Sequence, residues 1–67
     1  QAEALAARAR RDSGDDDTAA LRRVFELVLQ RAPSPAEQRD ATALVAAVGI
    51  EALCRAMLNC NEFLFVP

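Results

Sequence analysis

Cys54 and Cys60 have the widest range of chemistry in this chain, because a thiol can form a disulfide, bind a metal or act as a nucleophile. On a helix, two residues six positions apart point about 240° apart, so this pair cannot close an undistorted disulfide. The sequence has no histidine, which removes the usual ligand sets of a structural zinc site and the usual base of a cysteine nucleophile. We therefore interpret both cysteines as small buried apolar side chains and expect no metal or cofactor in this segment.

Carboxylates are the next candidates for chemistry. The acidic run at 15–17 lacks the spaced ligands and terminal glutamate of a calcium-binding loop, and aspartates favour the start of a helix, where the helix dipole stabilises negative charge. Glu37 and Asp40 are candidates for acid–base catalysis, but the sequence predicts no distance from either to a second carboxylate. We interpret the run as a solvated helix cap and expect no catalytic site in this segment.

Basic residues offer little for nucleic-acid binding. All eight are arginines, they are scattered, and the net charge is −2, whereas DNA-binding domains carry a basic stripe. Residues 35–58 have the outline of a helix-turn-helix, but its second helix offers only Glu51 and Arg55 as charged side chains. We expect no nucleic-acid partner. Arg31 is interpreted as a helix-end cap or a member of an internal ion pair, with anion binding as the alternative.

The elements that must position these residues are helical throughout. Residues 2–11 are strong helix formers with one large apolar side chain, Leu5, and we expect Gly14 to end the turn that follows. Residues 18–31 carry an apolar stripe at the spacing of a helix, and Pro33 is expected to stop it. No segment alternates as a half-buried strand does. The sequence therefore predicts an all-α fold.

The segment "SPAEQ" predicts where a third helix begins. Ser34 is a good N-cap, Pro35 suits the first helical position, and Glu37 stands three residues after the cap, which completes a capping box. We expect this helix to begin at Pro35 and to end at Gly49, followed by a fourth helix over residues 50–58.

The C-terminal segment "LNCNEFLFVP" places polar residues between apolar ones. Asparagine leaves helical geometry at low cost, so we expect the chain to turn back at Asn59, with Glu62 within reach of Arg31. Phe63 is then expected to insert between the second and fourth helices, with Phe65 more exposed.

These observations predict a small all-α bundle of three core helices, with a weakly anchored N-terminal helix and a folded-back C-terminal tail. We expect residues 1–14 to belong to a larger upstream domain and residues 15–67 to form a helical C-terminal module. Removing residues 1–12 should then change stability little. The chain begins at Gln1 and ends at Pro67, so we expect it to be a piece of a longer protein, and no apolar run predicts membrane insertion.

Two separated motifs, "FELVLQRAPSPAEQ" and "LCRAMLNCNEFLFV", resemble the C-terminal end of planctomycete-type, multi-domain extracytoplasmic proteins. Those proteins contain paired domains of unknown function, often with a cytochrome-c-like domain. Their ends carry an arginine-proline helix junction, a glutamate beyond it and a Leu-Asn-x-Asn-Glu-Phe close. The matching residues are Arg31, Pro33, Glu37, Leu58, Asn59, Asn61, Glu62 and Phe63. A second bacterial family, found in secreted proteins, ends in a similar Ser-x-Glu-Phe close, but Cys60 stands where its serine would be.

The resemblance implies a non-catalytic helical module that closes the C-terminus of a larger extracytoplasmic protein. Its partners would be upstream domains of the same chain, and any haem would lie in such a domain, since this segment lacks the Cys-x-x-Cys-His attachment motif. Two alternatives stay open: a helical module that binds another protein in trans, and a fragment of an enzyme or redox protein whose active residues lie upstream.

Overall fold

Four α-helices make up the part of the chain that the structure, a computed structural model, describes: the backbone of residues 1–64 and the side chains of residues 1–59. The helices are α1 (Ala2–Ser13), α2 (Asp17–Leu29), α3 (Pro35–Val48) and α4 (Ile50–Leu64). No strand occurs within these residues. The all-α prediction is confirmed.

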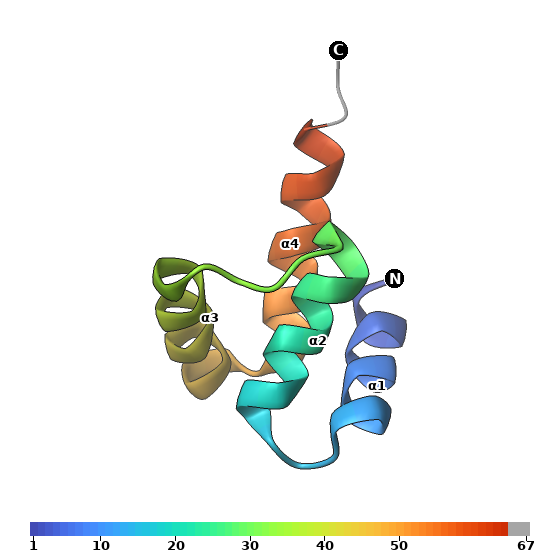
Figure 1. Cartoon of the computed structure of the whole chain (residues 1–67). Helices are drawn as coiled ribbons and strands as arrows, with labels where there is room; N and C mark the ends of the chain where they lie inside the picture. The colour runs from blue at the N-terminus through green and yellow to red at the C-terminus, as the bar shows by residue number, and fades with distance from the viewer. Residues whose placement is uncertain (65–67) are drawn as a thin grey trace.

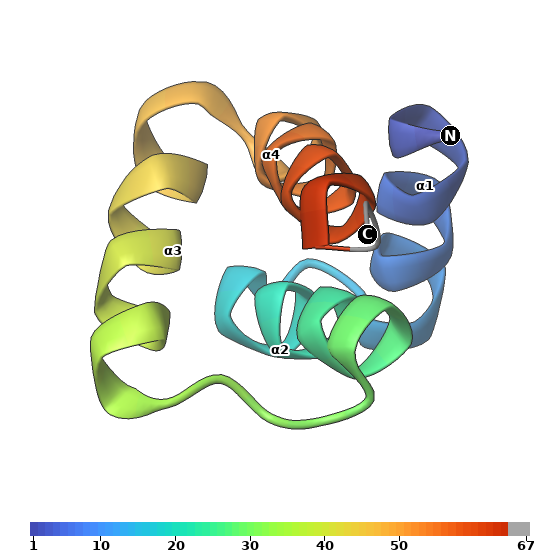
Figure 2. The same ribbon diagram turned by 90° about the horizontal axis from the view of Figure 1, so that it is seen from above.

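α2 and α4 lie side by side in the middle of the molecule, and α1 and α3 flank them on opposite sides (Figures 1 and 2). α4 contacts all three other helices. The core is apolar and all four helices contribute to it; its members are Ala6, Ala9, Ala20, Leu21, Val24, Phe25, Ala41, Val45, Ile50, Leu53 and Cys54.

The α1–α2 corner is built from a glycine and an aspartate. Gly14 follows α1 with a φ of 69°, a region that glycine enters without steric cost. Asp16 is the N-cap of α2, and its carboxylate accepts hydrogen bonds from the backbone N–H groups of Thr18 and Ala19 at 3.0 and 3.4 Å. Asp16 of the acidic run therefore caps α2, as the sequence predicts for this run.

α2 ends earlier than we predicted. Its last residue is Leu29, and Gln30 adopts the left-handed conformation, with φ 60° and ψ 32°, while its N–H still donates to the Glu26 carbonyl. This geometry closes helices, so the helix ends before Pro33 is reached. Arg31 consequently lies in the connection between α2 and α3, and the predicted end of this helix at Arg31 is wrong.

α3 begins and ends where the sequence predicts. It starts at Pro35 after the N-cap Ser34, and both hydrogen bonds of the capping box are present. It ends at Val48, and Gly49 alone connects it to α4, with φ 99° and ψ 167°. That backbone region is nearly exclusive to glycine, so one residue turns the chain from α3 into α4.

α4 continues beyond its predicted end at Leu58 and runs to Leu64, so the expected turn at Asn59 and the folded-back tail up to Leu64 are wrong. Placing asparagine in place of alanine within a helix costs at most about 0.7 kcal/mol. Residues 59–64 contain neither glycine nor proline, so no residue in this segment breaks the helix. The backbone hydrogen bonds continue although the apolar stripe is interrupted. The expected insertion of Phe63 and exposure of Phe65 concern residues outside the described side chains.

α1 packs against the core through more residues than we predicted. It packs along both α2 and α4, and Ala6 and Ala9 are buried, Ala9 completely. Alanine has little apolar area, but its small side chain lets two helix axes approach closely. We expected α1 to be anchored by Leu5 alone because we considered only large apolar side chains. This expectation is wrong, since Ala6 and Ala9 are also buried. The assignment of residues 1–14 to an upstream domain stays a prediction.

Candidate functional site

The connection from α2 to α3 holds the tightest polar arrangement in the described part of the chain. Arg31 donates two parallel hydrogen bonds to Glu37, from Nη1 to Oε1 at 2.7 Å and from Nη2 to Oε2 at 2.9 Å. Glu37 Oε1 also accepts from the backbone N–H of Ser34 at 2.8 Å, and Ser34 Oγ accepts from the Glu37 N–H at 3.2 Å. One carboxylate thus completes the capping box and pairs with a guanidinium.

These bonds stabilise the charged form of Glu37. The Arg31 hydrogen bonds, with the backbone N–H of Ser34 second, lower the pKa of Glu37 from 4.5 to about 2. The same partnership raises the pKa of Arg31 above its ordinary value. A carboxylate that holds its charge so strongly is a poor general acid or base near neutral pH. The arrangement ties the α2–α3 connection to the first turn of α3.

Three of the residues singled out from the sequence therefore come together: Arg31, Ser34 and Glu37. Pro33 lies between them in the chain and borders a shallow hollow with α3. The internal ion pair considered for Arg31 is present, but its partner is Glu37, six positions away. Asn59 is exposed on α4, and the side chains of Asn61, Glu62 and Phe63 lie outside the described residues.

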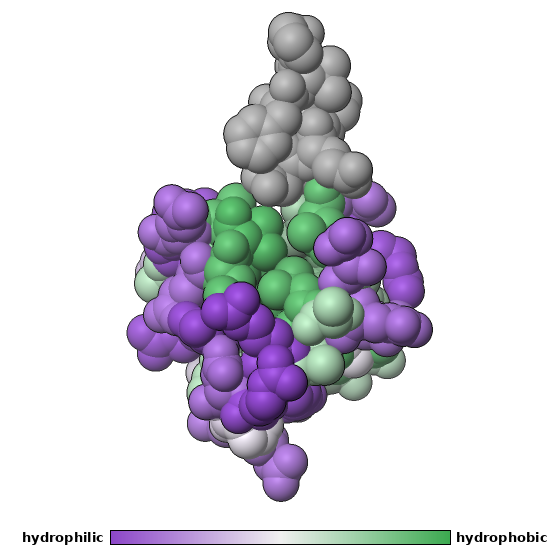
Figure 3. All heavy atoms as spheres, turned by 90° about the vertical axis from the view of Figure 1, so that its right-hand side faces the viewer, coloured by the Kyte–Doolittle hydropathy of each residue, from purple (hydrophilic) through white to green (hydrophobic). Residues whose placement is uncertain are grey.

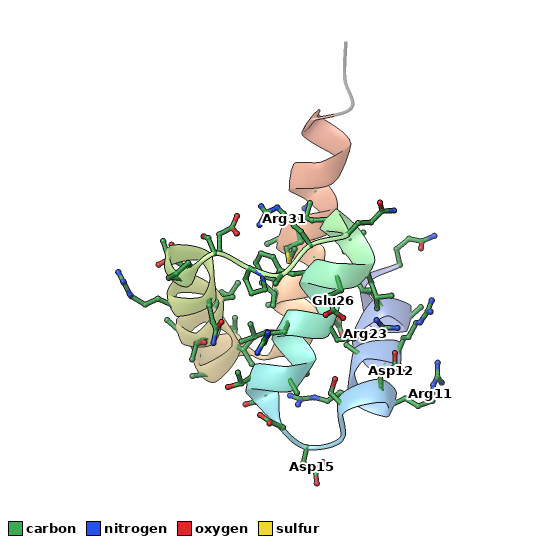
Figure 4. The ribbon with its side chains drawn as sticks, viewed as in Figure 1. Arg11, Asp12, Asp15, Arg23, Glu26 and Arg31 are labelled. Carbon is green, nitrogen blue, oxygen red and sulfur yellow. The ribbon has the colours of Figure 1, made fainter. Side chains whose placement is uncertain are left out.

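A second polar cluster ties α1 to α2, and sequence reasoning missed it. Arg23 donates from Nε to Asp12 Oδ2 at 2.8 Å and from Nη1 to Glu26 Oε1 at 3.2 Å, and the three side chains lie together in Figure 4. The Arg23 hydrogen bond lowers the pKa of Asp12. Only Arg23 and Glu26, three apart on one helix, have a spacing that predicts contact. Asp12 is brought near by the α1–α2 turn.

Cys54 is an inert apolar side chain in this structure. It is completely buried in the core and is a free thiol. Burial, with a smaller contribution from the charge of Glu51, raises the pKa of the Cys54 thiol to about 11. A buried thiol that stays protonated is neither a nucleophile nor a metal ligand at neutral pH. The side chain of Cys60, also on α4, lies outside the described residues.

Two hollows that include apolar side chains lie between the helices. The first, which we call the α1–α2–α4 groove, has a volume of about 330 Å³, and apolar residues gather on this side of the molecule in Figure 3. Its lining residues are Gln1, Ala4, Leu5, Arg8, Leu27, Val28 and Leu58. The second, which we call the α3 groove, has a volume of about 210 Å³ and is lined by Phe25, Glu37, Asp40, Ala41, Leu44 and Leu53.

Among residues whose side chains are described, no three His, Cys, Asp or Glu lie close enough to hold a metal ion. None of the helices in the described range has the length and apolar character needed to cross a bilayer. Comparison of the chain with family models, with curated proteins and with solved structures found no match.

Proposed function

We propose that this chain is a non-catalytic helical module that packs against another protein surface within a larger extracytoplasmic protein. The observation that carries the proposal is the α1–α2–α4 groove, where Leu5, Leu27, Val28 and Leu58 are only half-buried. Burial of apolar surface is the main favourable term in most protein association. A hollow lined by four such side chains favours a packing role.

The polar side chains with the strongest interactions serve the fold, and this supports the same proposal. Arg31 and Glu37 are paired with each other at the α2–α3 connection, Asp12 and Arg23 at the α1–α2 contact. Their hydrogen-bonding capacity is used inside the chain, and Cys54 is buried. The arrangement favours stability and shape over a reaction.

The resemblance described above supports the setting of the proposal. The Arg31–Pro33 junction and the close at residues 58–63 resemble the motifs at the end of planctomycete-type multi-domain proteins. Under this proposal the first partners are upstream domains of the same chain, and any haem belongs to such a domain. A helical module that binds another protein in trans is the second candidate, and the same groove supports it.

A cross-linking experiment tests the proposal. A photoreactive phenylalanine analogue replaces Leu27 in the full-length protein, and a control replaces Thr42, which is exposed on α3. We expect position 27 to cross-link to residues outside α1–α4 of its own copy, mapped by mass spectrometry, and position 42 to do so far less. Equal labelling at both positions, or products confined to the same four helices, would show that the groove faces solvent and would overturn the proposal.

A further inference from the structure

α3 and α4 are joined by a single residue, Gly49, and the chain changes direction sharply there (Figures 1 and 2). Gly49 has φ 99° and ψ 167°, a backbone region that only glycine enters without strain. A Cβ atom placed on Gly49 would meet no atom within 4 Å apart from its chain neighbours. The corner is therefore set by the backbone conformation of this residue and not by a lack of space for a side chain.

The conformation of Gly49 is what separates α3 from α4. Its N–H donates to the Val45 carbonyl at 2.9 Å, as it would in an uninterrupted helix, and α4 begins at the next residue, Ile50. Residues 36–64 contain no proline. A helical conformation at Gly49 would therefore join α3 and α4 into one helix over residues 35–64, about 45 Å long. The same sequence has a bent form and a straight form.

In the straight form α4 leaves its own core. Ile50, Leu53 and Cys54 are buried in the bent form, and a straight monomer would expose them to water. α1, α2 and α3 would each lose the helix that they contact. Exposure of this apolar surface disfavours a straight monomer. A helix with the same side chains restores every contact, and a second copy of this chain supplies that helix.

We propose that α4 exchanges between two copies of this chain, with Gly49 as the hinge. In the exchanged dimer each copy is straight at Gly49, and its α4 packs on α1, α2 and α3 of the other copy. Exchange of an identical element re-forms the contacts of the monomer and is a low-cost route to a dimer, and short hinges under strain favour it. The inference goes beyond the proposed function and does not rest on it, because it does not use the α1–α2–α4 groove.

Val48, the residue before the hinge, fits this exchange. Among the described side chains it is the only large apolar one that is mostly exposed, with an exposed fraction of 63%. Each straight helix runs from one half of the exchanged dimer to the other, so the two-fold axis lies near the two hinges. The dimer therefore brings the two Val48 side chains towards each other, and burial of their apolar surface favours it.

Gly49→Ala distinguishes the two forms. Alanine is strained at the φ of 99° that the bent form requires, and it is the best helix former in the straight form, so both effects favour the dimer. Sedimentation equilibrium of the purified chain, from about 10 µM to about 1 mM, should show Gly49→Ala dimerising at least about tenfold more tightly than the wild type.

Gly14→Ala is the matched control. Gly14 also has a positive φ, 69°, and its Cβ would also meet no atom within 4 Å apart from its chain neighbours, so the strain of the substitution is of the same kind. Residues 14–16 separate α1 from α2, and Asp16 caps α2 separately. Gly14→Ala should therefore remain monomeric.

A distance measurement shows whether the dimer is the exchanged one. Spin-labelled amino acids replace Ala36 and Asn59, which are exposed on α3 and α4, and labelled copies are diluted with unlabelled ones. In a straight helix these two backbone positions lie about 35 Å apart, and in the bent chain they lie closer. The wild-type chain, refolded from urea at about 1 mM, should show both distances, and Gly49→Ala mainly the longer one.

A Gly49→Ala chain that is folded and monomeric, or one that stays unfolded by circular dichroism up to about 1 mM, overturns the inference. A dimer that keeps the shorter distance overturns it too, since it joins two bent copies, as does a wild-type chain with the shorter distance alone. Equal dimerisation by Gly14→Ala would count against the hinge in the same way. A Gly49→Ala chain that regains helix content only as it dimerises supports the inference, because the exchanged dimer is then its folded form.

Discussion

α1 and α3 flank the same pair of helices in different ways. α1 buries Ala6 and Ala9 against α2 and α4, and two ion pairs link it to α2: Arg10 with Asp17 at 2.6 Å and Arg23 with Asp12 at 2.8 Å. The contact is close at Ala6 and Ala9, whereas Ala4, Leu5 and Arg8 border the α1–α2–α4 groove.

α3 packs with Ala41 and Val45 buried, and the α3 groove of about 210 Å³ remains beside it. Its strongest restraints lie at its ends: the capping box with the Arg31–Glu37 pair at the start, and the single residue Gly49 at the finish. The comparison teaches that a helix poor in large apolar side chains can still pack closely where its small side chains meet the core, because small side chains permit close approach, although the α1–α2–α4 groove lies beside the same helix.

The largest expected effect tests whether α1 belongs to the cooperative unit. Deleting residues 1–12 removes Ala6, Ala9 and Asp12 and uncovers the faces of α2 and α4 on which α1 packs. We expect loss of the cooperative thermal transition, followed by circular dichroism. An unchanged midpoint would restore the expectation of weak anchoring.

A matched pair of substitutions compares the packing of the two flanks. Ala9 is completely buried, so Ala9→Leu should overpack the α1 contact and cost about 1–3 kcal/mol. Ala41 borders the α3 groove, so Ala41→Leu has space to enter and should cost less than about 1 kcal/mol. Urea denaturation measures both. Equal costs would mean that the two flanks are packed alike.

The restraint at the start of α3 depends on Ser34. Ser34→Ala removes the acceptor for the Glu37 N–H and should lower the free energy of unfolding by about 1 kcal/mol. Thr42→Ala, at an exposed position of the same helix, is the control and should be neutral or slightly stabilising, since alanine favours helices. A neutral Ser34→Ala would show that the cap does not hold this flank.

The smallest expected effect is the pH dependence of the Arg31–Glu37 pair, which is exposed and screened by water. The pKa of Glu37 is about 2 in the fold, against an ordinary value of 4.5. The folded state therefore binds fewer protons than the unfolded state between these values, and its stabilisation is present above pH 4.5 and is lost as pH falls towards 2.

Glu37→Gln cannot ionise and is the variant for this measurement. Unfolding by urea at a series of pH values should show the wild-type chain more stable at neutral pH, with the difference shrinking as pH falls towards 2. A difference that is constant with pH would mean that the charge of Glu37 does not contribute.

Local interactions were predictable from the sequence and distant ones were not. Ser34, Pro35 and Glu37 lie within four positions, so their capping box follows from spacing alone. Gly14 and Gly49 mark the ends of helices for a similar reason, because their positive φ values are a property of one residue.

The contact of Asp12 with Arg23, by contrast, depends on how α1 turns onto α2. The close packing of Ala9 depends on two helices that are adjacent only in space. The left-handed conformation of Gln30 also escaped prediction, since glutamine rarely adopts it. The groove on which the proposed function rests is lined by residues of α1, α2 and α4. It could not be predicted from any single segment of the sequence.

The central position of α4 has a consequence for the order in which the chain is made. α2 and α4 each contact all three other helices, but α4 follows α1, α2 and α3 in the chain, so these three helices are synthesised before one of the two central helices exists. At a synthesis rate of about 5–20 residues per second, the apolar faces of α1, α2 and α3 that pack on α4 stay uncovered by it for a time on the order of seconds. A nascent chain that stalls before Leu53 therefore presents to chaperones and proteases the core residues that α4 covers in the folded chain.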